Sequence, residues 1–249
     1  MPTLTVADKA VTRGHVIVPR QGAWHAELWL DADTAPSGAV ALSWGDGEAT
    51  WQGAVVRGGV VTEGGPAAVR LVGGAGGLGK ALPGASYRNV SPRVIVGQIL
   101  TAAGETLSGT SPSATLSPLW ARWSRQAGAA GAQVAALALA LGALWRVLPD
   151  GTVYLGPDPG GVLTLGKDQQ VTARAPALGR VTLATSAPWT LQVGQTLDGQ
   201  RIDTVIHRLG PDEVRSELWL ALANSSRPWS SGSWAAWTPS RSTRPPSRP

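Results

Sequence analysis

The residues most suggestive of chemistry form a glycine-rich run at residues 74–80, which reads Gly-Ala-Gly-Gly-Leu-Gly-Lys. The run follows a predicted strand and satisfies the G-x-x-x-x-G-K part of a phosphate-binding loop, in which backbone amides cradle phosphate groups. Two further requirements are not met. Ala81 stands where a Ser or Thr hydroxyl would bind Mg²⁺, and Pro83 and Gly84 prevent the helix whose first amides would face the phosphates. We therefore interpret the run as a glycine-rich loop and predict no nucleotide cofactor.

Histidines, cysteines and carboxylates show no arrangement that predicts a catalytic or metal site. The histidines, His15, His25 and His207, are isolated from one another, and the chain contains no cysteine that could complete a ligand set. His25 and His207 lie in predicted strands, where a packed or half-exposed residue is the simpler interpretation. Several acidic residues adjoin Gly or Pro and are explained as turn residues: Asp46, Asp150, Asp158, Asp198 and Asp212.

A nucleophile motif of the G-x-S-x-G type is also missing from the sequence. We therefore predict no catalytic residue, no cofactor and no metal ligand, and we expect that the chain is not an enzyme. One enzyme class stays open, because a hydrolase can draw its two carboxylates from distant positions in the sequence.

The elements that would position any site begin with short strands over the first ninety residues. Alternating or apolar runs predict strands at residues 24–30, 40–44, 51–56, 60–62 and 67–72, and glycines break the runs at residues 45–47 and 57–59. Short strands at this spacing favour a small barrel or sandwich.

The middle of the chain changes to helical spacing. Ser91 and Pro92 are typical of a helix start, and Gly104 is typical of a helix end. A second helix is expected at about residues 129–141. Residues 144–148 and 152–155 then predict a β-hairpin, because the turn sequence Pro-Asp-Gly separates two apolar strands.

Strands return at residues 180–185, 190–193, 201–208 and 214–222. Ser-Glu-Leu-Trp-Leu at residues 216–220 echoes Ala-Glu-Leu-Trp-Leu at residues 26–30, which fits two related β units around a helical insert. The sequence thus predicts a mainly β protein with an α+β insert, built from small β-barrel units that flank a helical segment. Its expected parts are an N-terminal barrel or meander (1–88), a helix–helix–hairpin insert (89–160), a C-terminal β unit (161–223) and a disordered tail (224–249).

The charge of the chain is concentrated at its C-terminal end. The net charge is +5, but residues 224–249 hold four arginines and no acid, which leaves 17 basic and 16 acidic residues for the body. A body so balanced lacks the signature of a nucleic-acid binder, so we expect no nucleic-acid partner. We also expect no signal peptide, and no membrane span at residues 126–145, because that uncharged stretch is mostly Ala and Gly.

The aromatic residues are dominated by tryptophan, with 12 Trp, 2 Tyr and no Phe. Tryptophan combines a large apolar face with one N–H donor, and it is enriched at protein interfaces. In the predicted strands the candidate interface residues are Trp24, Trp29, Trp44, Trp51 and Trp219. The alternative is a Trp-rich barrel that stacks carbohydrate or single-stranded nucleic acid on exposed indole rings.

Several stretches together carry a family resemblance. Residues 22–28 and 51–55 form a strand pair ending in a W-x-G-x-V step, and residues 72–92 lead from the glycine-rich run into the first helix. Residues 136–156 combine a helix with the hairpin, and residues 191–197 and 202–208 look like the end of a barrel. With these motifs the chain resembles the baseplate hub proteins of bacteriophage tails and related contractile injection systems, broadly the late-control-protein-D-like group.

The likeness covers most of residues 10–222, and nothing after Asn224 matches the family. The resemblance implies a homotrimer that forms a ring at the tip of the tail tube and adapts a six-fold tube to a three-fold spike. Its implied partners are the tail-tube or distal tail protein, the spike protein and the tape-measure protein. Its implied location is the virion tail, assembled in the cytoplasm of the bacterial host. A cell-wall hydrolase carried on a tail is the enzyme alternative.

Overall fold

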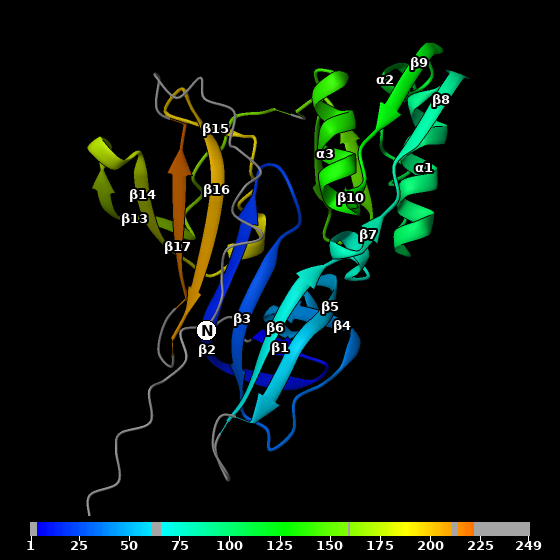
Figure 1. Cartoon of the computed structure of the whole chain (residues 1–249). Helices are drawn as coiled ribbons and strands as arrows, with labels where there is room; N and C mark the ends of the chain where they lie inside the picture. The colour runs from blue at the N-terminus through cyan, green and yellow to red at the C-terminus, as the bar shows by residue number, and fades with distance from the viewer. Residues whose placement is uncertain (1–3, 61–65, 159, 211–213, 222–249) are drawn as a thin grey trace, which may run out of the picture.

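The computed structural model describes residues 4–60, 66–158, 160–210 and 214–221. It confirms a mainly β protein with a small helical segment (Figure 1). The tail predicted at residues 224–249 lies outside the described residues.

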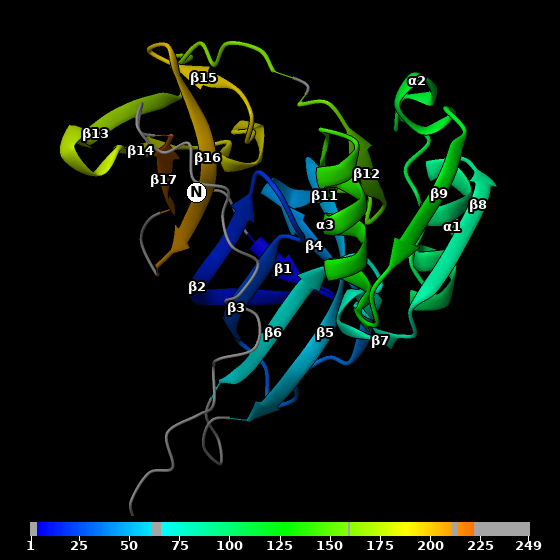
Figure 2. The same ribbon diagram turned by 45° about the horizontal axis from the view of Figure 1, so that its top comes forward.

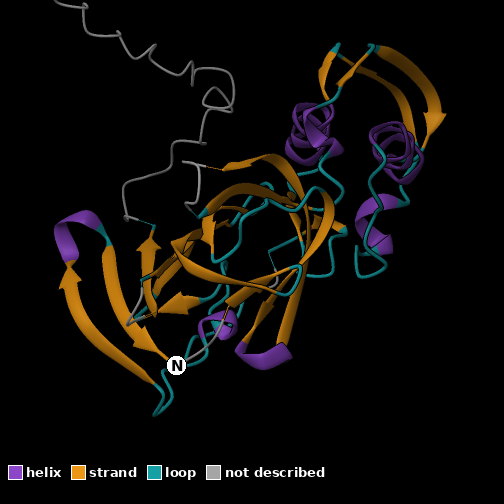
Figure 3. Cartoon of the chain, turned by 90° about the horizontal axis from the view of Figure 1, so that it is seen from below, coloured by secondary structure: helices purple, strands orange, loops and turns teal. Residues whose placement is uncertain are grey.

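The N-terminal strands close into a six-stranded antiparallel barrel. The pairing runs in the order β1-β4-β5-β6-β3-β2, and β2 returns to β1 to close the ring, which is seen end-on in Figure 3. The six strands are β1 (Leu4–Val6), β2 (Lys9–Pro19), β3 (His25–Leu30), β4 (Gly38–Trp44), β5 (Ala49–Val60) and β6 (Ala67–Gly73).

Alternation along these strands explains which side chains fill the barrel. In β3 the residues Ala26, Leu28 and Leu30 are buried and their neighbours are not, as period-two geometry requires. The break predicted at residues 57–59 is wrong, because β5 continues through these residues to Val60. The strand accommodates them with a shift in pairing register between Val55 and Arg57, which is a β-bulge.

The helical insert combines two main helices with short strand pairs. The predicted helices are confirmed as α1 (Pro92–Ala103) and α3 (Ala130–Ala140), and Gly104 ends α1 in the left-handed conformation. The predicted hairpin is confirmed as β11 (Leu144–Val147) and β12 (Val153–Gly156). The remaining elements are α2 (Ser113–Leu116), β7 (Ala81–Leu82), β8 (Ala85–Val90), β9 (Trp120–Arg125) and β10 (Gly128–Ala129). Within the described residues, no helix is long and apolar enough to cross a membrane.

The C-terminal strands extend the barrel sheet through β2. Their order is β2-β16-β17-β14-β13, and β15 pairs with β16. A strand predicted at residues 190–193 is wrong, because the 3-10 turn η4 (Pro188–Thr190) and a buried loop occupy this part of the chain. The strands are β13 (Gln169–Ala175), β14 (Arg180–Thr185), β15 (Thr196–Leu197), β16 (Gln200–Leu209) and β17 (Val214–Leu220).

Two hydrophobic cores result from this arrangement. The larger core joins the barrel interior to α1, α3 and the β11–β12 hairpin, and the smaller one lies under the C-terminal sheet. Figure 2 shows the helices on one side of the barrel and the C-terminal sheet on the other. The boundaries predicted for the parts of the chain stay predictions.

Candidate interface residues

Three of the five candidate tryptophans fill the barrel. Trp24, Trp44 and Trp51 are 2%, 0% and 5% exposed. The ring centroid of Trp51 lies 5.5 Å from that of Trp24 and 5.8 Å from that of Trp44. Gly73 lies directly against the indole of Trp24, where a side chain would overlap the ring. Packing within the chain therefore accounts for these three tryptophans, and none of them presents an exposed ring to a partner.

A histidine from the C-terminal sheet completes this aromatic cluster. The His207 ring, on β16, lies 5.4 Å from the Trp44 ring, and its Nδ1 is 2.9 Å from the Ser216 hydroxyl oxygen. The residue is fully buried, and this burial lowers the pKa of His207 to about 3. His207 is thus a neutral packing residue that couples the barrel to the C-terminal sheet.

The other two candidate tryptophans occupy equivalent positions in the two repeated pentapeptides. Trp29 on β3 and Trp219 on β17 are both half-buried, whereas the leucines on either side of each are buried. The Arg13 guanidinium lies 4.8 Å from the Trp29 ring centroid, and the Arg180 guanidinium lies 5.9 Å from that of Trp219. Each arginine sits directly opposite its tryptophan on the neighbouring strand. Both sheets therefore carry a Trp–Arg cation–π pair on the outer face.

The glutamates of the two pentapeptides are also matched. Glu27 pairs with Arg70 at 3.5 Å, and Glu217 pairs with Arg208 at 2.7 Å. Tryptophan and arginine are the residue types most enriched among residues that dominate binding energy at interfaces. Trp29 and Trp219 therefore remain predicted interface residues, one on the barrel and one on the C-terminal sheet.

The glycine-rich run has a structural role. The carboxylate of Glu105 accepts hydrogen bonds from the backbone amides of Ala75 at 2.9 Å and Gly77 at 2.7 Å. In a phosphate-binding loop, backbone amides at these positions would donate to the phosphate. Here they donate to the buried carboxylate of Glu105, which follows α1. A side chain at Gly77 would overlap the carbonyl oxygen of Ala103. The run thus fastens the end of α1 to the barrel.

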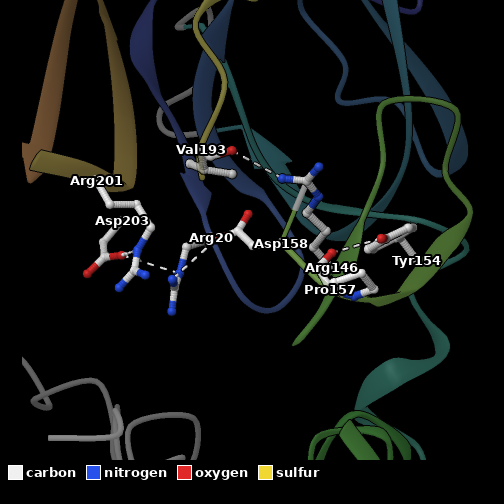
Figure 4. A network of polar contacts seen from close by, with 8 residues as sticks. All are labelled: Arg20, Arg146, Tyr154, Pro157, Asp158, Val193, Arg201 and Asp203. Carbon is white, nitrogen blue, oxygen red and sulfur yellow. Dashed lines mark hydrogen bonds and ion pairs between the residues drawn. The ribbon is translucent and has the colours of Figure 1, made fainter. Parts of the chain in front are cut away.

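A polar network joins the barrel to the segments on either side of it (Figure 4). The Arg20 guanidinium, at the end of the barrel, lies 3.3 Å from both the Asp158 and the Asp203 carboxylates. Beside it, Arg146 donates to the carbonyl oxygen of Val193 at 3.2 Å, and burial lowers the pKa of Arg146. Asp158 was predicted as a turn residue, and its carboxylate here accepts a hydrogen bond from Arg20, which also pairs with Asp203. The network has a structural role.

One exposed element was missed by sequence reasoning. Strands β8 and β9 form a two-stranded sheet, although no strand was predicted at residues 120–125. Tyr87, Trp120 and Trp123 pack inward against the large core, whereas Arg88 and Arg122 are exposed. The sequence Trp-Ala-Arg-Trp-Ser-Arg at residues 120–125 was the available signal, because aromatic and polar residues mix in it as on a half-buried strand.

A metal site finds no support in the described part of the chain, where no cluster of three or more His, Asp or Glu side chains could hold an ion. Neither protein-family models nor curated proteins match the sequence.

Solved structures, in contrast, share its fold. The prophage MuSo2 43 kDa tail protein from Shewanella oneidensis aligns with a TM-score of 0.65 and 11% identity over 88% of this chain and 97% of that one. A tail protein from Neisseria meningitidis MC58 aligns with a TM-score of 0.61 and 12% identity over 89% and 97%. The E. coli c3393 protein, a type VI secretion component described as similar to the T4 tail proteins gp27 and gp5, aligns with a TM-score of 0.56 and 12% identity over 89% and 77%.

Proposed function

We propose that this chain is a structural subunit of a phage-type tail, and more specifically a baseplate hub that joins the tail tube to the central spike. The observation that carries the proposal is the fold, which is shared over 88% of this chain and 97% of a prophage tail protein. The similarity therefore extends over the barrel, the insert and the C-terminal sheet together. The proposed location is the virion tail.

A ring-forming role requires two different contact surfaces on each subunit. Head-to-tail interfaces use one patch against another, and they close into a ring when the rotation between subunits permits. Trp29 with Arg13 on the barrel and Trp219 with Arg180 on the C-terminal sheet supply two such patches. We propose that they contact neighbouring subunits or the tube and spike proteins. This role needs no catalytic residue.

The first test is the mass of the purified full-length chain in solution, measured by light scattering across a range of concentrations. A hub is expected to give three times the mass of one chain when alone, or a complex that contains three copies of the chain when mixed with any tail-tube and spike proteins encoded beside it. A chain that stays monomeric in all of these mixtures would overturn the proposal.

The second test addresses the two tryptophan patches. Trp29→Ala and Trp219→Ala are each expected to weaken ring formation by about 30-fold, the scale of an interface residue worth roughly 2 kcal/mol. Leu139→Ala is the matched control, because Leu139 on α3 is 76% exposed and lies outside both patches. Circular dichroism verifies that each variant is folded. Unchanged assembly of both tryptophan variants would remove these patches from the proposal.

A further inference from the structure

The β8–β9 sheet stands beside α1 at the outer side of the insert (Figures 1 and 2). It consists of two strands alone, because no third described strand pairs with either β8 or β9. Both strands therefore present a row of backbone N–H and C=O groups that a further strand could use.

Its two faces differ sharply in composition. On the inner face, the Tyr87 and Trp123 rings lie 6.0 Å apart, and the Arg125 guanidinium lies 5.9 Å from the Tyr87 ring and donates to Gln133. On the outer face, Arg88 lies directly opposite Arg122. The Tyr87 and Trp123 rings thus pack against the protein core, whereas Arg88 and Arg122 face solvent.

The arginine pair has no internal acid to balance it. Like charges directly opposite each other destabilise a strand pair. The chain does tolerate this arrangement elsewhere: Arg57 lies opposite Arg70, but there Arg70 also pairs with Glu27 at 3.5 Å. In the described part of the chain, no hydrogen bond or ion pair reaches the guanidinium of Arg88 or Arg122.

The surrounding sequence explains why no carboxylate of the described residues pairs with Arg88 or Arg122. From residue 66 to residue 149 the chain contains a single acidic residue, Glu105. Its carboxylate is buried and already accepts two backbone hydrogen bonds from the glycine-rich run. A carboxylate that pairs with these arginines would therefore come from outside this part of the chain.

We propose that the β8–β9 sheet binds an acidic, extended segment of a partner protein, which adds as a strand to one of its two free edges. Every second side chain of an added strand would lie on the outer face, where carboxylates can pair with Arg88 and Arg122. Leu119, which is 74% exposed beside β9, adds an apolar contact. This inference rests on the proposed function, because it specifies the chemistry of one partner of the tail subunit.

A nucleic-acid ligand fits this surface less well. Single-stranded nucleic acid is bound by aromatic rings on which bases stack, within a long cationic groove. Here the rings of Tyr87, Trp120 and Trp123 pack against the protein core, and the outer face offers two arginines. A strand edge with a small cationic face suits a carboxylate-bearing polypeptide.

The test is fluorescence polarisation with the full-length chain and labelled probes. The probe is an eight-residue peptide of alternating Glu and Thr, compared with a Gln–Thr peptide, a Glu–Pro peptide and a single-stranded DNA of 20 nucleotides. We expect the Glu–Thr peptide to bind at least about tenfold more tightly than each of the others, since the Gln peptide lacks charge and the Pro peptide lacks the amides that pair with a strand edge. Tighter binding of DNA, or equal binding of the Pro peptide, would overturn the inference.

The double variant Arg88→Glu with Arg122→Glu is expected to lose this binding by at least about tenfold. Arg57→Glu is the control, because it makes the same type of replacement, at one position, in an arginine pair that already has an acid, and it is expected to bind normally. The oligomer mass is measured on the same samples. An intact ring that binds no acidic peptide refutes this inference and leaves the hub proposal standing. Loss of the ring in the double variant alone would assign the surface to a second copy of the chain and would also refute it.

Discussion

Two of the two-stranded sheets of the insert, β11–β12 and β8–β9, differ in how they pack against the rest of the protein. Seven of the eight residues of β11–β12 are buried, whereas no residue of β8–β9 is fully buried. The β11–β12 hairpin is joined to the barrel by backbone hydrogen bonds, from Gly22 to Trp145 at 2.9 Å and from Gln52 to Pro149 at 2.7 Å. Among the described residues, β8 and β9 share backbone hydrogen bonds only with each other.

This difference shows what each sheet contributes. An isolated two-stranded sheet is marginally stable in water, so each must rest on a neighbouring surface. The β11–β12 hairpin uses both faces and its backbone for that purpose and becomes part of the core. The β8–β9 sheet uses one face, and its other face and both edges stay available. The first is therefore a stability element and the second is an accessible surface.

The largest expected difference between the two sheets is the cost of removing a tryptophan. Trp145→Ala on β11 should destabilise the protein by about 3–5 kcal/mol, because it leaves a cavity among buried side chains. Trp123→Ala on β9 should cost less than half as much, because Trp123 is half-exposed. Urea unfolding of both variants measures the free energies. Equal losses would contradict the distinction drawn between the sheets.

The next effect concerns the glycine-rich run, which lies beneath the turn of β11–β12. Glu105→Ala should lower the free energy of unfolding by about 1.5–3 kcal/mol, because two backbone amides lose their acceptor. Glu105→Gln keeps one acceptor oxygen and should lose less. Hydrogen exchange should show faster opening of β11–β12 in Glu105→Ala and little change at β8–β9. Faster opening confined to β8–β9 would show that the run does not support the buried hairpin.

Acid should act at the buried His207, which lies between the barrel and the C-terminal sheet and outside both sheets of the insert. The pKa of His207 is lowered to about 3 by burial, so between pH 6.5 and pH 5 the unfolded chain binds a proton that the folded chain does not. Stability should therefore fall with decreasing pH, with a slope that rises to about 1.4 kcal/mol per unit near pH 5 for this proton. Burial also lowers the pKa of His15 and His25, which adds in the same direction.

The matched variant for this effect is His207→Gln, which removes the titrating group from the aromatic cluster. Its free energy of unfolding should depend less steeply on pH over the same interval, whatever its absolute stability. Urea titrations at pH 6.5, 5.75 and 5 provide the slopes. An unchanged slope in His207→Gln would show that this ring does not control the acid response.

The smallest effect is a gain in stability at the exposed sheet. Arg88→Glu converts the cross-strand arginine pair into an opposite-charge pair with Arg122, which should stabilise the protein by about 0.2–1 kcal/mol. The gain should shrink in 1 M salt, because exposed charges are screened. Thermal unfolding at low and high salt measures both. A loss of stability at low salt would show that Arg88 already has a favourable environment.

The sequence predicted the elements whose signals are local. The hairpin turn at Pro149, Asp150 and Gly151 lies between its two strands, and the first helix carries its own start at Pro92 and its own end at Gly104. The strands β8 and β9 have no local turn between them, because residues 91–119 separate them, and their pairing depends on tertiary structure.

The exposure of the candidate interface residues could be predicted only in part, because it too depends on tertiary structure. Trp24, Trp44 and Trp51 look like surface candidates in isolated strands, but barrel closure turns them inward, and closure depends on pairing between β1 and both β2 and β4. Trp29 and Trp219 were recognisable through the repeated pentapeptide. Their arginine partners were not, because each comes from a neighbouring strand.

The position of β2 has a consequence for biosynthesis. This strand closes the barrel by pairing with β1 and β3, and its outer edge pairs with β16, whose residues 200–209 emerge from the ribosome late. A chain grows from its N-terminus, and pairings between distant segments form slowly. Until residues 200–209 have been synthesised, the nascent barrel therefore has an uncovered β2 edge, at which it can misassemble. The pairing of β16 with β2 ends that exposure, so synthesis has to reach β16 before this edge is protected from aggregation.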